Sequence, residues 1–372
     1  MNVSERVFNP DNAGLSFTLP SDYYVSPEHY RKELDAVFAR SWNLACHRTQ
    51  VAEPGQYVRC RAGEEEIIVT RDRGGALKAF YNVCMHRAHT LIQDDRGSTR
   101  LITCPYHAWS YQLDGSLNSA RNCDRVEGFC KEDFSLKEVG VEEFCGFVFV
   151  NLDPEARPLA SQAPGLQERI LKHCPDLSQL KFAHRLTWDI QCNWKTAMEN
   201  FSECYHCAPA HAGFVDLVNM KTYTLDTHDI WSIHVGPPGD ASKSPYTYTA
   251  TDDRPQDYIA VLLWPNITMW IMPGSGNISM LYMLPTGPET CTEVMDFFLM
   301  DEQPSKEEWD SIVYLRDVLQ PEDIRLCENV QKGLRSRGYR TGRLVVDRQR
   351  SGISEHATHH FQSMIYHALQ GA

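Results

Sequence analysis

The sequence predicts an α+β protein, with an all-β unit in its first half and a larger unit of sheet and helices after it. Short β-rich runs separated by turn residues fill roughly residues 44 to 150. A proline-rich stretch at 151–165 is typical of a linker. Longer apolar strands follow from 221 to 300, and two helical patterns come after them. We therefore expect an N-terminal segment at 1–43 that packs on the last part, an all-β domain at 44–155 and a larger domain at 156–372.

Composition excludes several classes of protein. The chain has 372 residues, 42% of them hydrophobic, and a formal net charge of −13, which argues against nucleic acid and anionic membranes as partners. Residues 1–19 lack a basic region followed by an apolar run, so we expect no secretory signal. The apolar stretch 258–272 is too short to span a bilayer. Thirteen scattered cysteines indicate a reducing compartment, the cytoplasm, with metal-bound and free thiols.

Capping residues and periodicity place the individual elements. Ser26 followed by Pro27 opens a helix, and Asn193 caps a second one. Alternation and β-branched residues predict strands at 66–70, 79–83, 147–150, 182–190, 231–235, 259–264, 268–271, 279–283 and 294–299. Helical patterns occupy 166–173, 305–319 and 321–336. The loop 236–255, rich in Gly, Pro, Ser and Asp, is a candidate cover for a site.

Two loops in the all-β region carry metal-binding residues. Cys84 and His86 stand in the first loop, and Cys104 and His107 in the second, with seventeen residues between the two motifs. One Cys and one His per loop suits a Rieske [2Fe–2S] centre, in which two Cys hold one iron and two His the other. A Cys2His2 zinc site is the structural alternative, but zinc-finger spacing would pair Cys with Cys and His with His. We expect His89 to be no ligand.

The stretch 200–211 contains Glu203, His206 and His211 directly after an apolar helix face. On a helix, Glu203 and His206 would lie side by side, and Pro209 would break that helix and bring His211 back. Two His and a carboxylate with open positions form the ligand set of non-haem iron(II) oxygenases. A solvated helix end is the plain alternative.

A second carboxylate competes for this role. Asp323 falls on the apolar stripe of the helix predicted at 321–336, where a charged group needs a partner. A helix N-terminus also favours an acid without any metal. Spacing alone leaves open whether Glu203 or Asp323 completes the site.

Both sets of residues together resemble the α subunits of Rieske non-haem iron oxygenases over nearly the whole chain. Further motifs look like the quaternary-ammonium branch of that family, whose members act on carnitine, glycine betaine, choline or stachydrine. The likeness is weakest from about 221 to 290, where the substrate pocket would be built. These motifs are Tyr81-Asn82-Val83-Cys84, Thr103-Cys104-Pro105-Tyr106-His107-Ala108-Trp109, Glu203-Cys204-Tyr205-His206-Cys207, Pro321-Glu322-Asp323, Val330-Gln331-Lys332-Gly333-Leu334 and Ser351-Gly352-Ile353-Ser354-Glu355-His356.

The resemblance implies a helix-grip-like catalytic domain behind the Rieske domain and a role for each candidate residue. Cys84 and Cys104 would hold one cluster iron, and His86 and His107 the other. His206, His211 and Asp323 would hold a mononuclear Fe(II). Glu203 would link His206 to His107 of a neighbouring subunit in a homotrimer. Met85 and Ala88 depart from the Pro and Gly that relatives often carry, but neither departure removes a ligand.

The resemblance also implies the reaction. We expect a terminal oxygenase that uses O2 to hydroxylate a carbon next to a quaternary nitrogen, leading to C–N cleavage. No G-x-G-x-x-G fingerprint opens a helix, so electrons would come from NAD(P)H through a separate flavin and iron–sulfur reductase. Aromatic-ring hydroxylation and a plain Rieske electron carrier are the alternatives. A cation would want aromatic faces, and the candidates on the expected pocket strands are Tyr258, Trp264, Trp270 and Tyr282.

Overall fold

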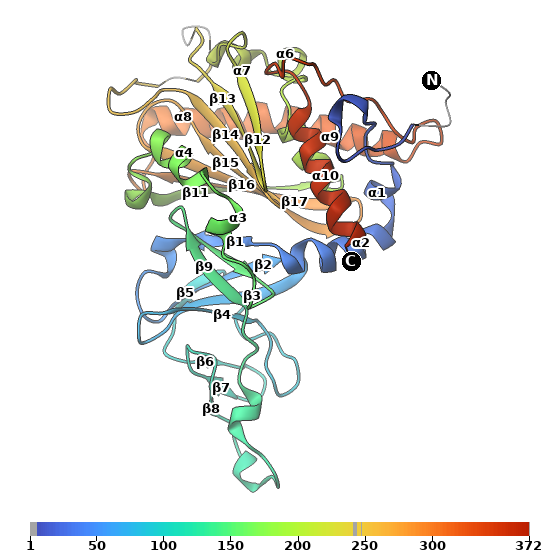
Figure 1. The fold of residues 1–372 in the computed structure, drawn as a ribbon. Coiled ribbons are helices and arrows are strands. Elements are labelled where there is room, and N and C mark those ends of the chain that lie inside the picture. The colour runs from blue at the N-terminus through green and yellow to red at the C-terminus, as the bar shows by residue number, and fades with distance from the viewer. Residues whose placement is uncertain (1–5, 241–243, 247, 372) are drawn as a thin grey trace. The chain divides into compact units, whose positions relative to one another are not determined.

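The computed structural model describes residues 6–240, 244–246 and 248–371 and divides into two compact units (Figure 1). The smaller unit spans residues 38–161. The larger unit consists of two segments, the chain up to Val37 and the chain from Gln162 onward. These divisions lie six residues from the predicted boundaries at 43/44 and 155/156. Positions 241–243 and 247 of the predicted loop 236–255 lie outside the described residues.

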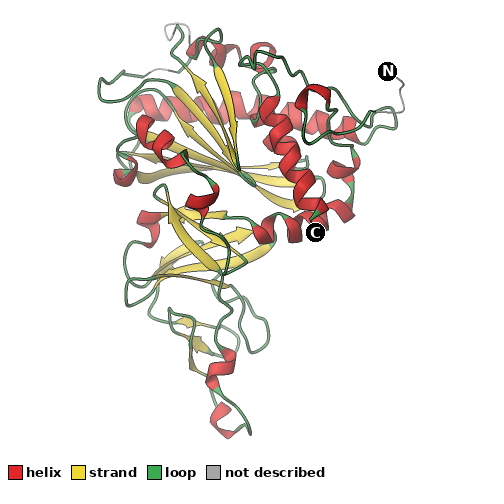
Figure 2. Ribbon diagram, viewed as in Figure 1, coloured by secondary structure: helices red, strands yellow, loops and turns green. Residues whose placement is uncertain are grey.

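The smaller unit consists of short antiparallel strands and loops (Figure 2). Its three sheets have the strand orders β1-β10-β9, β4-β3-β2-β5 and β6-β7-β8. The strands are β1 Asn43–His47, β2 Gln56–Ala62, β3 Glu65–Arg71, β4 Leu77–Tyr81, β5 Arg96–Ser98, β6 Ile102–Thr103, β7 Ser110–Tyr111, β8 Leu117–Ser119, β9 Gly140–Phe144 and β10 Phe147–Asn151. A short helix, α3 Leu159–Gln162, follows β10.

A seven-stranded antiparallel sheet forms the centre of the larger unit, in the order β11-β17-β16-β15-β14-β13-β12. Its strands are β11 Lys181–Ile190, β12 Thr224–His228, β13 Trp231–Gly236, β14 Tyr258–Leu263, β15 Ile267–Ile271, β16 Asn277–Gly287 and β17 Thr290–Leu299. The helices around it are α1 Asp22–Val25, α2 Pro27–Ala36, α4 Leu166–His173, α5 Trp194–Phe201, α6 Cys207–Ala210, α7 Ala212–Leu217, α8 Lys306–Tyr314, α9 Gln320–Leu334 and α10 His356–Gln370. The predicted antiparallel sheet with covering helices is confirmed.

One face of this sheet carries the cavities of the larger unit. Ala260, Trp270 and Ser279 lie opposite one another on three adjacent strands, so their side chains share a face. This face and helices α5, α8 and α9 together enclose two adjoining cavities, both bordered by Trp270. The sheet and helices therefore form a layered scaffold with an internal site between the layers.

The two predicted C-terminal helices are one continuous run. A π-helical segment, Leu315–Leu319, joins α8 to α9 without a loop, and Pro321 lies in the first turn of α9. Because proline has no N–H to donate, it leaves a carbonyl of the preceding turn without its intrahelical bond, and the π-helical segment lies in that turn. The prediction of two separate helices is therefore wrong, although their outer bounds are close. The helical pattern at 305–319 predicts that Trp309 is buried, but it is 40% exposed.

Other sequence predictions have mixed outcomes. Ser26 accepts N–H bonds from the first turn of α2, and Asn193 accepts one from Lys195, so both predicted caps are confirmed. Strand β12 and helix α10 were not predicted, although α10 carries apolar residues at helical spacing, Ala357, Phe361, Ile365 and Ala368. No helix in the described part of the chain combines the length and apolarity that crossing a bilayer requires.

A buried ion pair fixes the start of α5, the helix that leads into the site. Lys195 Nζ lies 2.5 Å from Glu33 Oε1, both side chains are fully buried, and Trp194 Nε1 donates to the second Glu33 oxygen at 2.8 Å. We expect Lys195→Met to destabilise the protein by about 3–5 kcal/mol, because it leaves an unpaired buried carboxylate. Denaturant unfolding followed by tryptophan fluorescence measures this change.

A double variant, Glu33→Gln with Lys195→Met, provides the control for this prediction. It removes both charges and should recover most of the lost free energy of unfolding. An unchanged unfolding midpoint in Lys195→Met alone would show that the pair does not stabilise the fold.

Candidate active site

The two Cys/His loops of the smaller unit have the same backbone hydrogen bonds. Cys84 N–H donates to His89 O and Ala88 N–H to Cys84 O, at 2.9 and 3.0 Å. In the second loop Cys104 N–H donates to Trp109 O and Ala108 N–H to Cys104 O, at 2.8 and 3.0 Å. Ala88 and Ala108 occupy equivalent left-handed positions, with φ of 55° and 59°. An alanine costs about 1 kcal/mol in that conformation, so the departure from Gly at Ala88 costs stability and leaves the loop shape intact.

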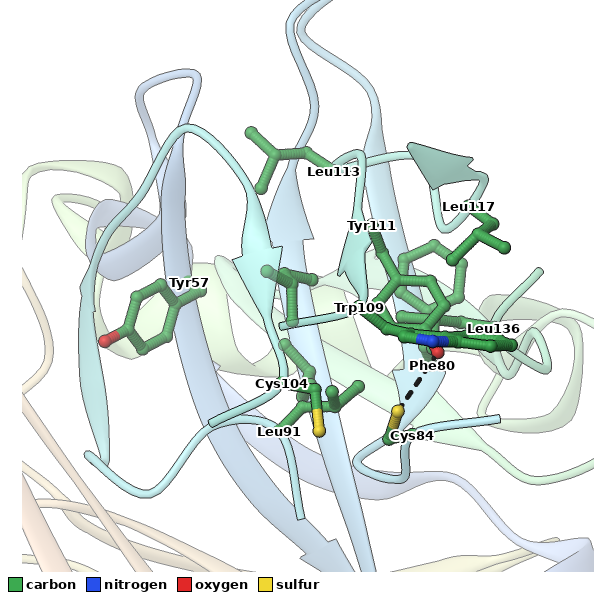
Figure 3. Packing of buried hydrophobic residues seen from close by; sticks show 12 residues of the cluster. Tyr57, Phe80, Cys84, Leu91, Cys104, Trp109, Tyr111, Leu113, Leu117 and Leu136 are labelled. Carbon is green, nitrogen blue, oxygen red and sulfur yellow. Dashed lines mark hydrogen bonds between the residues drawn. The ribbon is translucent and has the colours of Figure 1, made fainter. Parts of the chain in front are cut away.

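The four predicted cluster residues lie together at the end of these loops. The Cys84 and Cys104 side chains are buried and their sulfurs are at one edge of the hydrophobic cluster around Tyr111 (Figure 3). Tyr111 Oη lies 3.3 Å from Cys84 Sγ and accepts the Met85 N–H. The rings of His86 and His107 are 4.6 Å apart, and His107 Nδ1 is buried without a hydrogen-bond partner among the described residues.

This arrangement suits a [2Fe–2S] cluster. Two thiols and two imidazoles converge, and an imidazole nitrogen that lacks a protein partner is free to coordinate iron. The Nδ1 atom of His89 instead lies 2.6 Å from Thr90 O. It is therefore not needed as a ligand.

The second site begins where α5 ends. The helix stops at Phe201, and Ser202 N–H caps it by donating to Met198 O and Glu199 O. The Glu203 carboxylate then accepts the N–H groups of Tyr205 and His206, so residues 203–206 form a turn outside the helix. The expectation that Pro209 breaks a helix carrying both residues is wrong: the break comes at Ser202, and Pro209 lies inside α6.

His206, His211 and Asp323 nevertheless come together. Their candidate ligand atoms all lie within 4.8 Å of one another. His211 Nε2 is 2.9 Å and His206 Nε2 3.4 Å from the same atom, Asp323 Oδ1, and the two rings are 5.1 Å apart. Two imidazoles and one carboxylate, with no fourth protein ligand in the group, form the set that suits a non-haem iron(II) site.

Two further carboxylates hold the outer nitrogens of these imidazoles. Glu203 Oε1 lies 2.5 Å from His206 Nδ1, and Glu322 Oε2 lies 2.8 Å from His211 Nδ1. A carboxylate at Nδ1 keeps the proton on that nitrogen and leaves the Nε2 lone pair for a metal. The glutamates therefore orient both imidazoles toward Asp323.

The electrostatics of this group favour a positive charge at its centre. Burial lowers the pKa of His206, but hydrogen bonds and charges from Asp323 and Glu203 outweigh it and raise the value to about 10. Burial likewise lowers the pKa of His211, but its contacts with Asp323 and Glu322 outweigh this effect. The pKa of His211 therefore lies above its usual value. A divalent cation held by the same residues would satisfy this preference.

Glu322 was not recognised from the sequence, and its contact gives a testable consequence. We expect Glu322→Gln to weaken iron binding at His211 by roughly 10- to 100-fold, because the imidazole loses the carboxylate that sets its tautomer. Iron retained after dialysis against a chelator measures the effect. Glu328→Gln, further along α9 and bonded to the Gln191 N–H, is the matched control and should retain iron like the wild type.

Cys204 and Cys207, on either side of the turn, form a disulfide with Cα atoms 4.9 Å apart. The expectation of only metal-bound and free thiols is wrong for this pair. The turn between α5 and α6 places the two residues, three apart in the sequence, within disulfide reach.

A cavity opens beside the three metal-binding candidates. Four of its aromatic rings form a continuous wall: Phe201 lies 5.6 Å from Trp270, Trp270 lies 6.2 Å from Tyr258, and Tyr258 lies 5.0 Å from Phe214. Tyr258 and Trp270 were predicted to line the pocket, and this is confirmed.

Trp264 and Tyr282 do not line this cavity. Trp264 packs against Phe361, and Tyr282 Oη accepts a bond from Arg185 at 3.2 Å. Tyr282 lies between Leu281 and Met283, which both face the cavity, so its own side chain points to the opposite face of the sheet.

Comparison with known proteins agrees with this geometry. The family model for the Rieske [2Fe–2S] domain matches residues 41–130. The family model for the catalytic domain of ring-hydroxylating alpha subunits matches residues 177–371. The chain belongs to the Rieske oxygenase α subunits. It therefore has a [2Fe–2S] domain and a catalytic domain of the kind that binds mononuclear iron. The predicted fold, cofactors and enzyme class are confirmed, and the alternative of a plain electron carrier is wrong.

Relatives of this Rieske oxygenase share most of its length. It is 39% identical over 362 residues to the carnitine monooxygenase oxygenase subunit of Acinetobacter baumannii, with 96% of both chains covered. It is 30% identical to the chloroplastic choline monooxygenase of Beta vulgaris, covering 95% of this chain and 78% of the relative. A solved quaternary ammonium Rieske monooxygenase, described in connection with carnitine oxidation and inter-subunit electron transfer, superposes with a TM-score of 0.89 at 37% identity, covering 96% of this chain and 97% of that one.

Two polar residues of this Rieske oxygenase's cavity were missed by the sequence reasoning. Glu293 on β17 is only 3% exposed and accepts a bond from the Gln320 amide. Burial, and then the charge of Asp323, raises the pKa of Glu293 to about 8. His234 on β13 lies 3.0 Å from the Tyr223 hydroxyl through Nδ1, and burial lowers its pKa to about 4, so its imidazole is neutral at pH 7.

Proposed function

We propose that this chain is the terminal oxygenase of a two-component monooxygenase that hydroxylates a carbon next to the nitrogen of a quaternary ammonium compound, leading to C–N cleavage. The observation that carries the proposal is the wall of four contiguous aromatic rings beside His206, His211 and Asp323. Aromatic faces attract quaternary ammonium groups through their quadrupoles, and they hold such a cation without a hydrogen bond. The similarity to carnitine and choline monooxygenases supports the same substrate class.

The proposed roles of the residues follow from their contacts. Cys84, Cys104, His86 and His107 would hold the [2Fe–2S] cluster, and His206, His211 and Asp323 the mononuclear iron. When bound, these groups supply one-electron transfer and O2 activation. The protein contributes orientation: Glu203 and Glu322 fix the imidazoles, and the aromatic wall positions the carbon next to nitrogen.

Glu203 is proposed to connect the two metal centres. It contacts His206 directly, and its side chain is only 13% exposed. The relative described with inter-subunit electron transfer supports transfer between subunits. We propose a homotrimer in which Glu203 contacts His107 of a neighbouring subunit. A separate NAD(P)H-dependent flavin and iron–sulfur reductase would deliver the electrons, and we propose the cytoplasm, where NAD(P)H is available, as the location.

Substrate turnover tests the proposal. Purified protein, loaded with iron and supplied with a matched reductase, is assayed for O2 consumption coupled to amine release with carnitine, glycine betaine, choline and an aromatic acid. We expect turnover of at least one quaternary ammonium compound and none of the aromatic acid. Turnover of the aromatic acid alone would refute the substrate class.

A pair of tryptophan variants tests the aromatic wall itself. Trp270→Leu keeps the cavity apolar but removes a ring face, so the KM for the quaternary ammonium substrate should rise by roughly tenfold. Trp309→Leu changes a partly exposed tryptophan on α8 that does not border the cavity, and it should behave like the wild type. Equal KM values for the two variants would argue against cation binding by the wall.

A further inference from the structure

We infer that the cavity selects quaternary ammonium cations that carry no carboxylate, with Glu293 as the counter-charge, over zwitterionic betaines. This inference rests on the proposed function and narrows its substrate class. It separates choline-like compounds, which have a net positive charge, from carnitine-like compounds, whose own carboxylate must also be accommodated.

The charges on the cavity wall are of one sign. Three carboxyl groups border the cavity, those of Glu203, Glu293 and Asp323, and none of the described residues that border it is a lysine or an arginine. The one other histidine among the described lining residues, besides the metal-binding candidates His206 and His211, is His234, and its imidazole is neutral at pH 7. A substrate carboxylate in this cavity would therefore have no cationic partner on the described wall.

A bound iron ion would not make the net charge around the cavity positive. A divalent ion held by His206, His211 and Asp323 would bring two positive charges, and the carboxylates of Asp323 and Glu203 already offset them. Glu293, with a pKa of about 8, is largely protonated at pH 7 in the empty cavity, and its hydrogen-bond donor among the described residues is the neutral amide of Gln320. A bound ammonium is the partner that would stabilise its ionised form.

The adjoining cavity gives a longer zwitterion no better place for its carboxylate. This second space shares Trp270 with the first, and the charged residues among its described lining are Glu307 and Glu308. Both are acids, and they accept bonds from Thr249 and Ser305. Burying a carboxylate without a cationic or well-placed hydrogen-bond partner is costly, so the penalty falls on the zwitterion alone.

Matched ligand pairs test the inference by direct binding. Isothermal titration calorimetry on the purified iron-loaded protein compares choline with glycine betaine, and γ-butyrobetaine methyl ester with γ-butyrobetaine. Each pair keeps the trimethylammonium group and changes the carboxylate. We expect the cation of each pair to bind roughly tenfold more tightly or better. Equal or tighter binding of the zwitterions would overturn the inference.

Glu293→Gln tests the counter-charge. The amide keeps the size and a hydrogen bond to Gln320, so the preference for the cation over the zwitterion should fall to within about threefold. Glu168→Gln removes the same charge from the exposed side of α4 and should keep the wild-type preference. An unchanged preference in Glu293→Gln would exclude Glu293 from recognition. If that variant does not fold, the ligand pairs on wild-type protein still decide the selectivity.

These outcomes are distinct from failure of the proposed function. Turnover of zwitterions in preference to cations would refute the selectivity while leaving quaternary ammonium oxidation in place. Binding of neither member of any pair, together with turnover of an aromatic acid, would refute the proposed function itself.

Discussion

Asp323→Ala is expected to reduce the iron content from three atoms per chain to the two of the [2Fe–2S] cluster and to abolish turnover. Asp323 is the one carboxylate that faces both His206 Nε2 and His211 Nε2, and two imidazoles alone bind iron(II) weakly. We expect a loss of turnover of at least about 10³-fold. Iron analysis with the visible spectrum of the cluster measures the two metal centres separately.

Asp317→Ala is the control for this variant. Asp317 lies on the π-helical segment before α9, is exposed and pairs only with Arg316 among its described neighbours. It should retain full iron content and activity. If Asp323→Ala retained three iron atoms per chain, other residues would have to hold the mononuclear iron, and the assignment of Asp323 as a ligand would be refuted.

Glu203→Gln is expected to separate metal content from catalysis. Glutamine can still accept the N–H groups of Tyr205 and His206, so the turn should persist, but the negative charge beside His206 Nδ1 is lost. The cluster should remain, and the mononuclear iron should bind roughly 10- to 100-fold more weakly, as in Glu322→Gln, so turnover is measured per bound iron. We expect it to fall by about 100-fold or more, because the carboxylate proposed to connect the two centres is gone. Single-turnover kinetics with a pre-reduced cluster, followed by its absorbance, measures electron transfer directly.

The rate of cluster reduction by the reductase is the internal control, because that step precedes the one through Glu203. It should be unchanged in Glu203→Gln. Wild-type turnover in this variant would show that Glu203 only supports the turn and that electrons take another route.

Local spacing was sufficient to predict the cluster loops and part of the second site. Cys84 and His86 are two residues apart, and Glu203 and His206 three apart, so their proximity follows from the chain itself. Asp323 could be proposed because a carboxylate on an apolar helix stripe needs a buried partner. Its actual partners lie more than a hundred residues earlier, and the family resemblance was needed to choose it over Glu203.

Residues whose role depends on the register of distant elements were not predictable in the same way. Tyr282 was assigned to the wrong face of the sheet. Successive side chains of a strand point to opposite faces, so an error of one residue in the register reverses the assignment. Glu322 contacts His211 only because the start of α9 lies beside the residue that separates α6 from α7. Glu293 did carry a signal: it shares a strand face with Cys291, Met295 and Phe297, where an acid stands out in an otherwise apolar row.

The π-helical segment Leu315–Leu319 acts as a rotational offset between the two halves of one long helix. An extra residue in a helical turn rotates everything after it by about 100° relative to an uninterrupted α-helix. Ile312, before the segment, packs toward the sheet, while Asp323, after it, faces the imidazoles. Deleting one residue here would keep the helix but turn Asp323 away from the metal. The insertion of a single amino acid can thus create or abolish a metal site without altering any of its ligands.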